Sequence, residues 1–130
     1  MDAKAISYSN PLFGGASGVH FAKVLERLGI AEQMKAKTRF PEEGGFTARL
    51  LVAGEVDMAI QQVGELLSVA GAELLGPLPG DLQSVTTFAI AVHATASQPD
   101  AAKAFIRYLR SPQAAAVMKA KGLDPVEDPR

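Results

Sequence analysis

Residues 5–28 read AISYSNPLFGGASGVHFAKVLERL, and this stretch decides the fold. A short β-type run over residues 6–9 ends at Asn10-Pro11, and a glycine-rich loop leads from it into an amphipathic helix. The apolar positions of that helix recur at i, i+3, i+4 and i+7: Phe21, Val24, Leu25 and Leu28. This spacing places them on one stripe that faces a core. The stretch therefore predicts a strand, a loop and a helix in direct succession.

The start of this helix has the features of an anion cradle. The first amide groups of a helix have no partner within it, and the helix dipole favours negative charge there. Small residues let a ligand approach those donors closely. The candidate ligand-binding residues of this loop are Asn10, Ala16, Ser17 and Gly18. The alternative is a loop that only connects, with Ser17 capping the helix.

The loop does not match the sharper glycine motifs. Val19 stands where a nucleophile elbow needs its second glycine. No lysine follows the glycines as in a P-loop, and their spacing differs from that of a dinucleotide-binding motif.

Composition describes one globular domain and excludes several classes of protein. The chain has 130 residues, of which 48% are hydrophobic and 21% charged, and its net charge is −1. We expect no nucleic-acid partner, because no basic cluster is present to neutralise phosphates. The absence of cysteine excludes disulfides and thiolate chemistry. No apolar signal region follows Met1, so we expect that the protein stays where it is made or that the chain begins downstream of its natural start.

Strand and helix patterns alternate along the chain. Strands are predicted at residues 6–9, 38–40, 56–60, 74–78 and 85–92, and helices at 16–28, 46–53, 63–67, 99–109 and 112–121. This order predicts an α/β three-layer sandwich with a mostly parallel sheet of about five strands, followed by two C-terminal helices. We expect a ligand-binding lobe over residues 1–97, a helical pair over 98–125 and a frayed tail over 126–130.

Three loops converge at the carboxyl ends of these strands, where ligands bind in parallel sheets. They span residues 14–18, 43–47 and 61–64. The second contains Gly44 and Gly45, and the third presents the amides of Gln61 and Gln62. We expect unpaired amides at two glycine-rich helix starts to face a common pocket, with one glutamine amide lining it. The alternative for the glutamines is hydrogen bonding to neighbouring loop backbone.

Catalytic and metal-binding groups are sparse. His20 and His93 have no carboxylate or cysteine at ligand spacing, so we expect no metal and no cofactor. Glu42-Glu43 has no histidine near it and is typical of a solvated turn. No nucleophile, base and orienting group come together, which predicts that the protein is not an enzyme. A hydrolase would have to use Ser17 with His20 as its base.

Three stretches carry a resemblance to one family. They are AISYSNPLFGGASGVHFAKVLERLGI, GGFTARLLVAGEVDMAIQQVGELL and PDAAKAFIRYLRSPQAAAVMKAKGLDP. They resemble the extracytoplasmic solute-binding proteins of ABC transporters, most closely the molybdate-binding-like branch of type II periplasmic binding proteins. The resemblance implies a hinged clamp of two lobes that passes a small anion, such as an oxyanion, to a membrane permease, outside the cytoplasm.

By this resemblance the chain corresponds to the second lobe alone. Ala16, Ser17 and Gly18 would supply backbone donors to the ligand, as would Gly44 and Gly45. Gln62 stands where molybdate binders often have tyrosine.

The resemblance includes no counterpart of the family's first lobe. By this comparison, the apolar stripes of the two final helices lack their usual partner. We expect these helices to fold back onto the lobe or to be buried in a homodimer. The alternative function is the effector-sensing domain of a LysR-type transcription regulator, which shares this lobe architecture and would need a DNA-reading helix-turn-helix.

Overall fold

The computed structural model describes residues 3–13 and 15–126 of the chain. Its contacts divide the chain into a first unit that ends at Val85 and a second unit that begins at Thr86. The sequence predicts a boundary after residue 97, and that division of domains stays a prediction. Residues 127–130 of the predicted tail lie outside the described residues.

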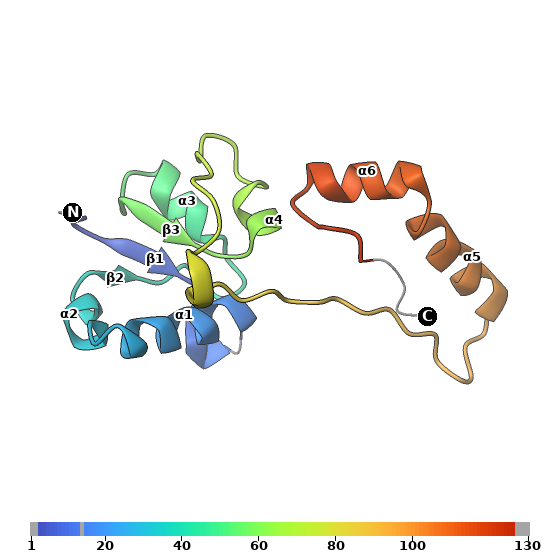
Figure 1. The fold of residues 1–130 in the computed structure, drawn as a ribbon, viewed down its shortest axis with the longest axis horizontal. Coiled ribbons are helices and arrows are strands. Elements are labelled where there is room, and N and C mark those ends of the chain that lie inside the picture. The colour runs from blue at the N-terminus through green and yellow to red at the C-terminus, as the bar shows by residue number, and fades with distance from the viewer. Residues whose placement is uncertain (1–2, 14, 127–130) are drawn as a thin grey trace. The chain divides into compact units, whose positions relative to one another are not determined.

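A small parallel sheet forms the centre of the first unit (Figure 1). Its strands are β1 (Ile6–Tyr8), β2 (Thr38–Arg39) and β3 (Met58–Ile60), in the order β2-β1-β3. β1 is the central strand and pairs in parallel with both neighbours. Parallel pairing places the carboxyl ends of all three strands at one edge of the sheet.

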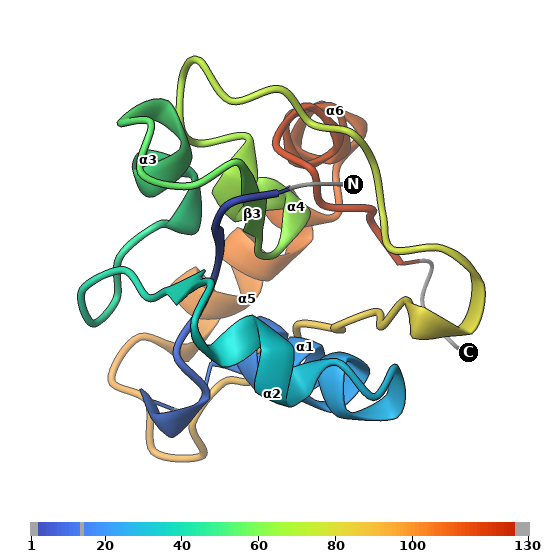
Figure 2. The ribbon, with the colours of Figure 1, turned by 90° about the vertical axis from the view of Figure 1, so that its left-hand side faces the viewer.

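Helices cover both faces of this sheet, as the two ribbon views show (Figures 1 and 2). The elements of the first unit besides the strands are α1 (Ala16–Arg27), α2 (Ala31–Lys35), α3 (Thr47–Val52), α4 (Val63–Leu66) and two 3-10 turns, η1 (Pro11–Phe13) and η2 (Gly80–Leu82). α1 and α2 lie on one face, and α3 packs on β1 and β3 from the other. The predicted α/β class with a parallel sheet is confirmed.

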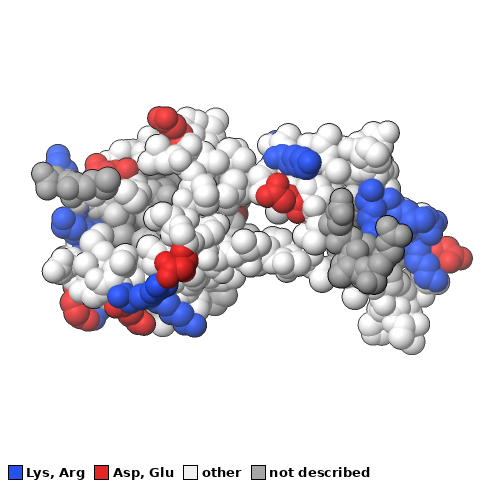
Figure 3. Space-filling view, in the orientation of Figure 1, with Lys and Arg blue, Asp and Glu red and all other residues white. Residues whose placement is uncertain are grey.

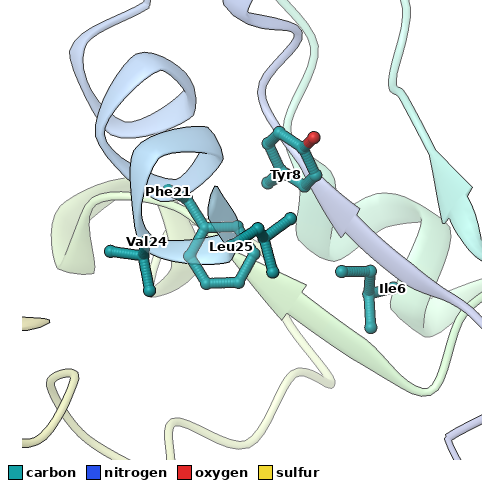
Figure 4. Packing of buried hydrophobic residues seen from close by; sticks show 5 residues of the cluster. All are labelled: Ile6, Tyr8, Phe21, Val24 and Leu25. Carbon is teal, nitrogen blue, oxygen red and sulfur yellow. The ribbon is translucent and has the colours of Figure 1, made fainter. Parts of the chain in front are cut away.

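The core lies between β1 and α1 (Figure 4). Its buried residues are Ile6, Tyr8, Phe21, Val24 and Leu25. The Tyr8 ring packs edge-on against the rings of Phe21 and Phe40, each with its centroid 5.2 Å away. The predicted stripe is correct except for Leu28, which caps the end of α1 and is 51% exposed.

The prediction of about five strands differs from the structure, whose described residues contain three. The segments 74–78 and 85–92 run as irregular or extended chain. Residues 84–92 make no backbone hydrogen bond within the described chain, and side chains such as Phe88 and Ile90 are exposed there. An alternating apolar pattern gives a strand only where another strand is present to pair with it.

The second unit contains the two predicted helices, α5 (Pro99–Leu109) and α6 (Pro112–Ala120). Proline occupies the first turn of each, and Ser111 Oγ accepts a hydrogen bond from the amide of Ala114 at 3.2 Å. Large apolar side chains of the pair, among them Phe105, Tyr108 and Val117, are exposed. Their burial against a partner stays a prediction. None of the described helices is both long and apolar enough to cross a membrane.

Candidate functional site

A pocket of about 310 Å³ lies at the carboxyl edge of the sheet in the first unit. The residues that line it are Ser9, Asn10, Phe13, Gly15, Pro41, Glu42, Glu43, Gly44, Gly45, Gln61 and Glu65. They come from the segments that follow β1, β2 and β3, which include η1 and α4. Of the candidate ligand-binding residues, Asn10, Gly44, Gly45 and Gln61 meet here, while Ala16, Ser17, Gly18 and Gln62 are not part of the lining.

The first wall of the pocket is the loop between β1 and α1. Asn10 shapes this loop, because its Oδ1 accepts a hydrogen bond from the Leu12 amide at 3.0 Å and its carbonyl accepts one from Phe13 at 3.1 Å. Gly15 is the N-cap of α1 and lines the pocket. The polar group of Asn10 therefore fixes the local turn at the rim.

Gly18 holds α1 close to the end of β1. A Cβ at this position would overlap the carbonyl oxygen of Ser9 and lie 2.8 Å from its carbonyl carbon. Gly18 is buried, so its first role is close packing. Within the described chain, the amides of Ala16, Ser17 and Gly18 have no acceptor. Whether these amides bind a ligand stays a prediction.

The second wall is the turn before α3, and here the expectation of unpaired amides is wrong. Gly44 has a φ of +71°, which lets the chain reverse, and the amide of Gly45 donates to Glu42 O at 2.8 Å. The first amide of α3, that of Thr47, donates to Gln61 Oε1 at 2.9 Å. The amides of Gly45 and Thr47 therefore have partners within the protein and are not free donors for a ligand.

The third wall is the loop after β3, where both glutamines serve the fold. Gln61 Oε1 also accepts from Thr47 Oγ1 at 3.0 Å, and Gln61 Nε2 lies 3.5 Å from Gly45 O. The amide of Gln62 donates to Glu65 Oε2 at 3.2 Å at the start of α4. The alternative of hydrogen bonding within the loops therefore describes Gln61, which nonetheless lines the pocket.

Carboxylates give the pocket its charge. Glu42, Glu43 and Glu65 line it, and among its described lining residues there is no lysine, arginine or histidine. Glu65 is the half-buried one of the three, and the Gln62 amide holds it in place. Sequence reasoning missed Glu65, although the spacing of Gln62 and Glu65 is a visible capping-box signal.

The histidines and Ser17 form no catalytic arrangement. The Nε2–H of His20 donates to Leu82 O at 2.8 Å, so this side chain ties η2 to α1. Arg27 reinforces the same connection through an ion pair with Asp81, which holds the Asp81 pKa below its ordinary value. His93 Nδ1 accepts from the amide of Thr95 at 3.2 Å in the second unit. His20 is therefore not positioned as a base for Ser17.

Charge elsewhere on the first unit is mixed. Figure 3 shows acidic and basic side chains intermingled over α1 and α2 on one face. No group of three or more histidine, cysteine, aspartate or glutamate side chains in the described residues is arranged to hold a metal ion.

A curated protein of a Pseudomonas species, named aconitate isomerase, is 34% identical to this chain over 128 residues. The match covers 95% of this chain and 46% of the relative, so the chain spans about half the length of the curated relative it matches. The prediction that the protein is not an enzyme is contradicted by this similarity. Sequence reasoning looked for a nucleophile together with its base, whereas an isomerase that moves a proton needs a base and no nucleophile.

A family model described as bacterial extracellular solute-binding protein matches residues 2–124. The match covers both units, from the strand and glycine loop at the start to the two final helices. The chain belongs to the family of bacterial extracellular solute-binding proteins.

Proposed function

We propose that this chain forms one lobe of a periplasmic solute-binding protein and that its pocket holds one side of a small polycarboxylic acid. The observation that carries the proposal is the convergence of three loops on one pocket, with Asn10, Gly15, Gly44 and Gln61 in its lining. The family supports a binding role, and the name of the relative supports a carboxylic acid as the solute. A second lobe would close over the ligand, and a permease would receive it.

Neutral donors at the start of α1 would hold a carboxylate of the ligand. The amides of Ala16 and Ser17 have no acceptor among the described residues, and they follow directly after Gly15, which lines the pocket. Backbone amides and the helix dipole stabilise an oxyanion without a countercharge. The rigid hydrogen bonds of Gln61 keep the opposite wall in place, which lowers the entropic cost of binding.

We also propose that the protein acts on its ligand as an isomerase. Shifting a carbon–carbon double bond beside a carboxylate requires a group that takes up a proton and returns it. The carboxylates of Glu42, Glu43 and Glu65 in the pocket are groups of that kind.

Isothermal titration calorimetry tests the binding proposal. The titrants are cis-aconitate, trans-aconitate, the saturated analogue propane-1,2,3-tricarboxylate, molybdate and sulfate. We expect heat from the tricarboxylates and none from the inorganic oxyanions. Binding of molybdate without binding of any tricarboxylate would contradict the proposal and favour the molybdate-like branch. Proton NMR of cis-aconitate incubated with the protein tests the isomerase activity separately.

A further inference from the structure

A second pocket, of about 190 Å³, adjoins the first one and has a different character. Its lining is Pro41, Glu42, Gly45, Phe46, Arg49 and Leu50, and it shares Pro41, Glu42 and Gly45 with the first pocket. Arg49 is the one basic side chain in the described lining of either pocket. A ligand carboxylate that reaches both pockets therefore meets a full positive charge only at Arg49.

The surroundings of Arg49 prepare it to bind an anion. Its guanidinium carbon lies 5.5 Å from the centroid of the Phe46 ring, so an aromatic face supports the group. Arg49 makes no ion pair or side-chain hydrogen bond within the described chain. Arg27, by contrast, is paired with Asp81, and Arg39 donates to the carbonyls of neighbouring residues. The donors of Arg49 are therefore not committed to the fold.

The other residues of the second pocket suit the carbon skeleton of a carboxylic acid. Pro41, Phe46 and Leu50 offer apolar surface to carbon atoms, and an apolar wall strengthens a nearby charge–charge interaction. Glu42 is the one carboxylate in this lining, and it repels an anionic ligand. The positive charge of Arg49 offsets that repulsion, so a carboxylate is repelled less in the second pocket than in the first.

We propose that Arg49 is a specificity-determining residue that binds one carboxylate of the ligand in the second pocket, while the remainder of the ligand lies in the first. This inference rests on the proposed function, since it requires a ligand with more than one carboxyl group. A guanidinium donates two parallel hydrogen bonds to a carboxylate, which an ammonium cannot do. Arg49 thereby selects a polycarboxylate over a monocarboxylate.

Calorimetry with trans-aconitate and acetate on three variants tests the assignment. We expect R49Q to bind trans-aconitate roughly 10- to 100-fold more weakly than the wild-type chain, the range expected for a charge-assisted hydrogen bond. R49K should recover part of this loss, because it keeps the charge without the planar fork. R107Q removes an exposed arginine of α5 and should bind as the wild-type chain does.

The outcomes separate the two proposals. Binding of trans-aconitate by R49Q within twofold of the wild-type affinity overturns the assignment of Arg49 and leaves the proposed function standing. A wild-type chain that binds no tricarboxylate overturns the proposed function itself. If R49Q does not fold, the side-chain Nε resonance of Arg49 in the wild-type chain decides. It should shift on addition of trans-aconitate, and an unmoved resonance at saturation overturns the assignment.

Discussion

The side-chain oxygen of Gln61 accepts two hydrogen bonds from Thr47, from its amide at 2.9 Å and from its hydroxyl at 3.0 Å. Thr47 is fully buried, so neither donor has water as an alternative. The bond joins the loop after β3 to the start of α3, and these two segments form adjacent walls of the pocket. The same contact therefore supports the fold and fixes the shape of the candidate site.

Replacing Gln61 should destabilise the protein. In Q61A both buried donors of Thr47 lose their acceptor, and we expect a loss of about 1–3 kcal/mol in the free energy of unfolding. Urea unfolding followed by circular dichroism measures it. Q62A is the matched control and should cost less, because Gln62 contributes its backbone amide to the cap of α4. Equal losses in the two variants would contradict the role assigned to Gln61.

Gly18 should tolerate no larger residue. In G18A the new methyl group would overlap the carbonyl oxygen of Ser9, and α1 would have to move away from β1. We expect a loss of about 3 kcal/mol or more. G15A is the control, since a Cβ there would lie 3.6 Å from Ser9 Cβ, an ordinary contact, and the φ of −64° suits alanine. Thermal unfolding of the two variants should differ clearly, and similar melting temperatures would refute the packing argument.

Stability should fall in acid because of Asp57. Its side chain accepts hydrogen bonds from the amides of Ala5 (3.2 Å) and Lys4 (2.5 Å), and these bonds hold its pKa below the ordinary value of 3.8. The unfolded chain then binds more protons near that pH, so stability rises with pH there. The contribution is fully present above the unfolded pKa and is lost as the pH falls through the folded one. In D57N the midpoint of urea unfolding should depend less on pH between pH 2 and 5 than it does in the wild-type chain. An equal pH dependence in the two proteins would show that Asp57 is not its cause.

Neutralising Glu43 should strengthen the binding of an anion in the first pocket. Glu43 is exposed and lines the first pocket, so its charge repels a bound carboxylate. We expect E43Q to bind trans-aconitate about two- to fivefold more tightly at low salt, with a smaller gain at higher ionic strength. E26Q, on the outer surface of α1, should leave the affinity unchanged. Weaker binding by E43Q would contradict this repulsion.

Local signals predicted much of the fold. The stripe of Phe21, Val24 and Leu25 identifies α1 and its buried face, and each residue is buried in the core. Proline and serine at the starts of the two last helices predict their beginnings correctly. These features depend on residues close together in sequence, where periodicity and capping chemistry act directly.

Strand number could not be predicted in the same way. Residues 85–92 carry a longer β-type pattern than β1, yet only β1 pairs within the described chain. The difference lies in the neighbours: β1 has a strand on each side of it, whereas residues 85–92 have none. Pairing depends on distant segments, which the local pattern does not encode.

The sequence by itself determined that a strand, a glycine loop and a helix begin this α/β chain, because spacing and turn chemistry are local. It also indicated that the loops after the strands meet at one edge, since parallel connection requires it. Only the tertiary structure decided which side chains and carbonyls pair with the amides there. Gln61 Oε1 accepts from the amide of Thr47 at the start of α3, and the carbonyl of Glu42 accepts from the amide of Gly45 before it. That outcome depends on side chains and carbonyls brought together from separate loops, and no single stretch of sequence contains them.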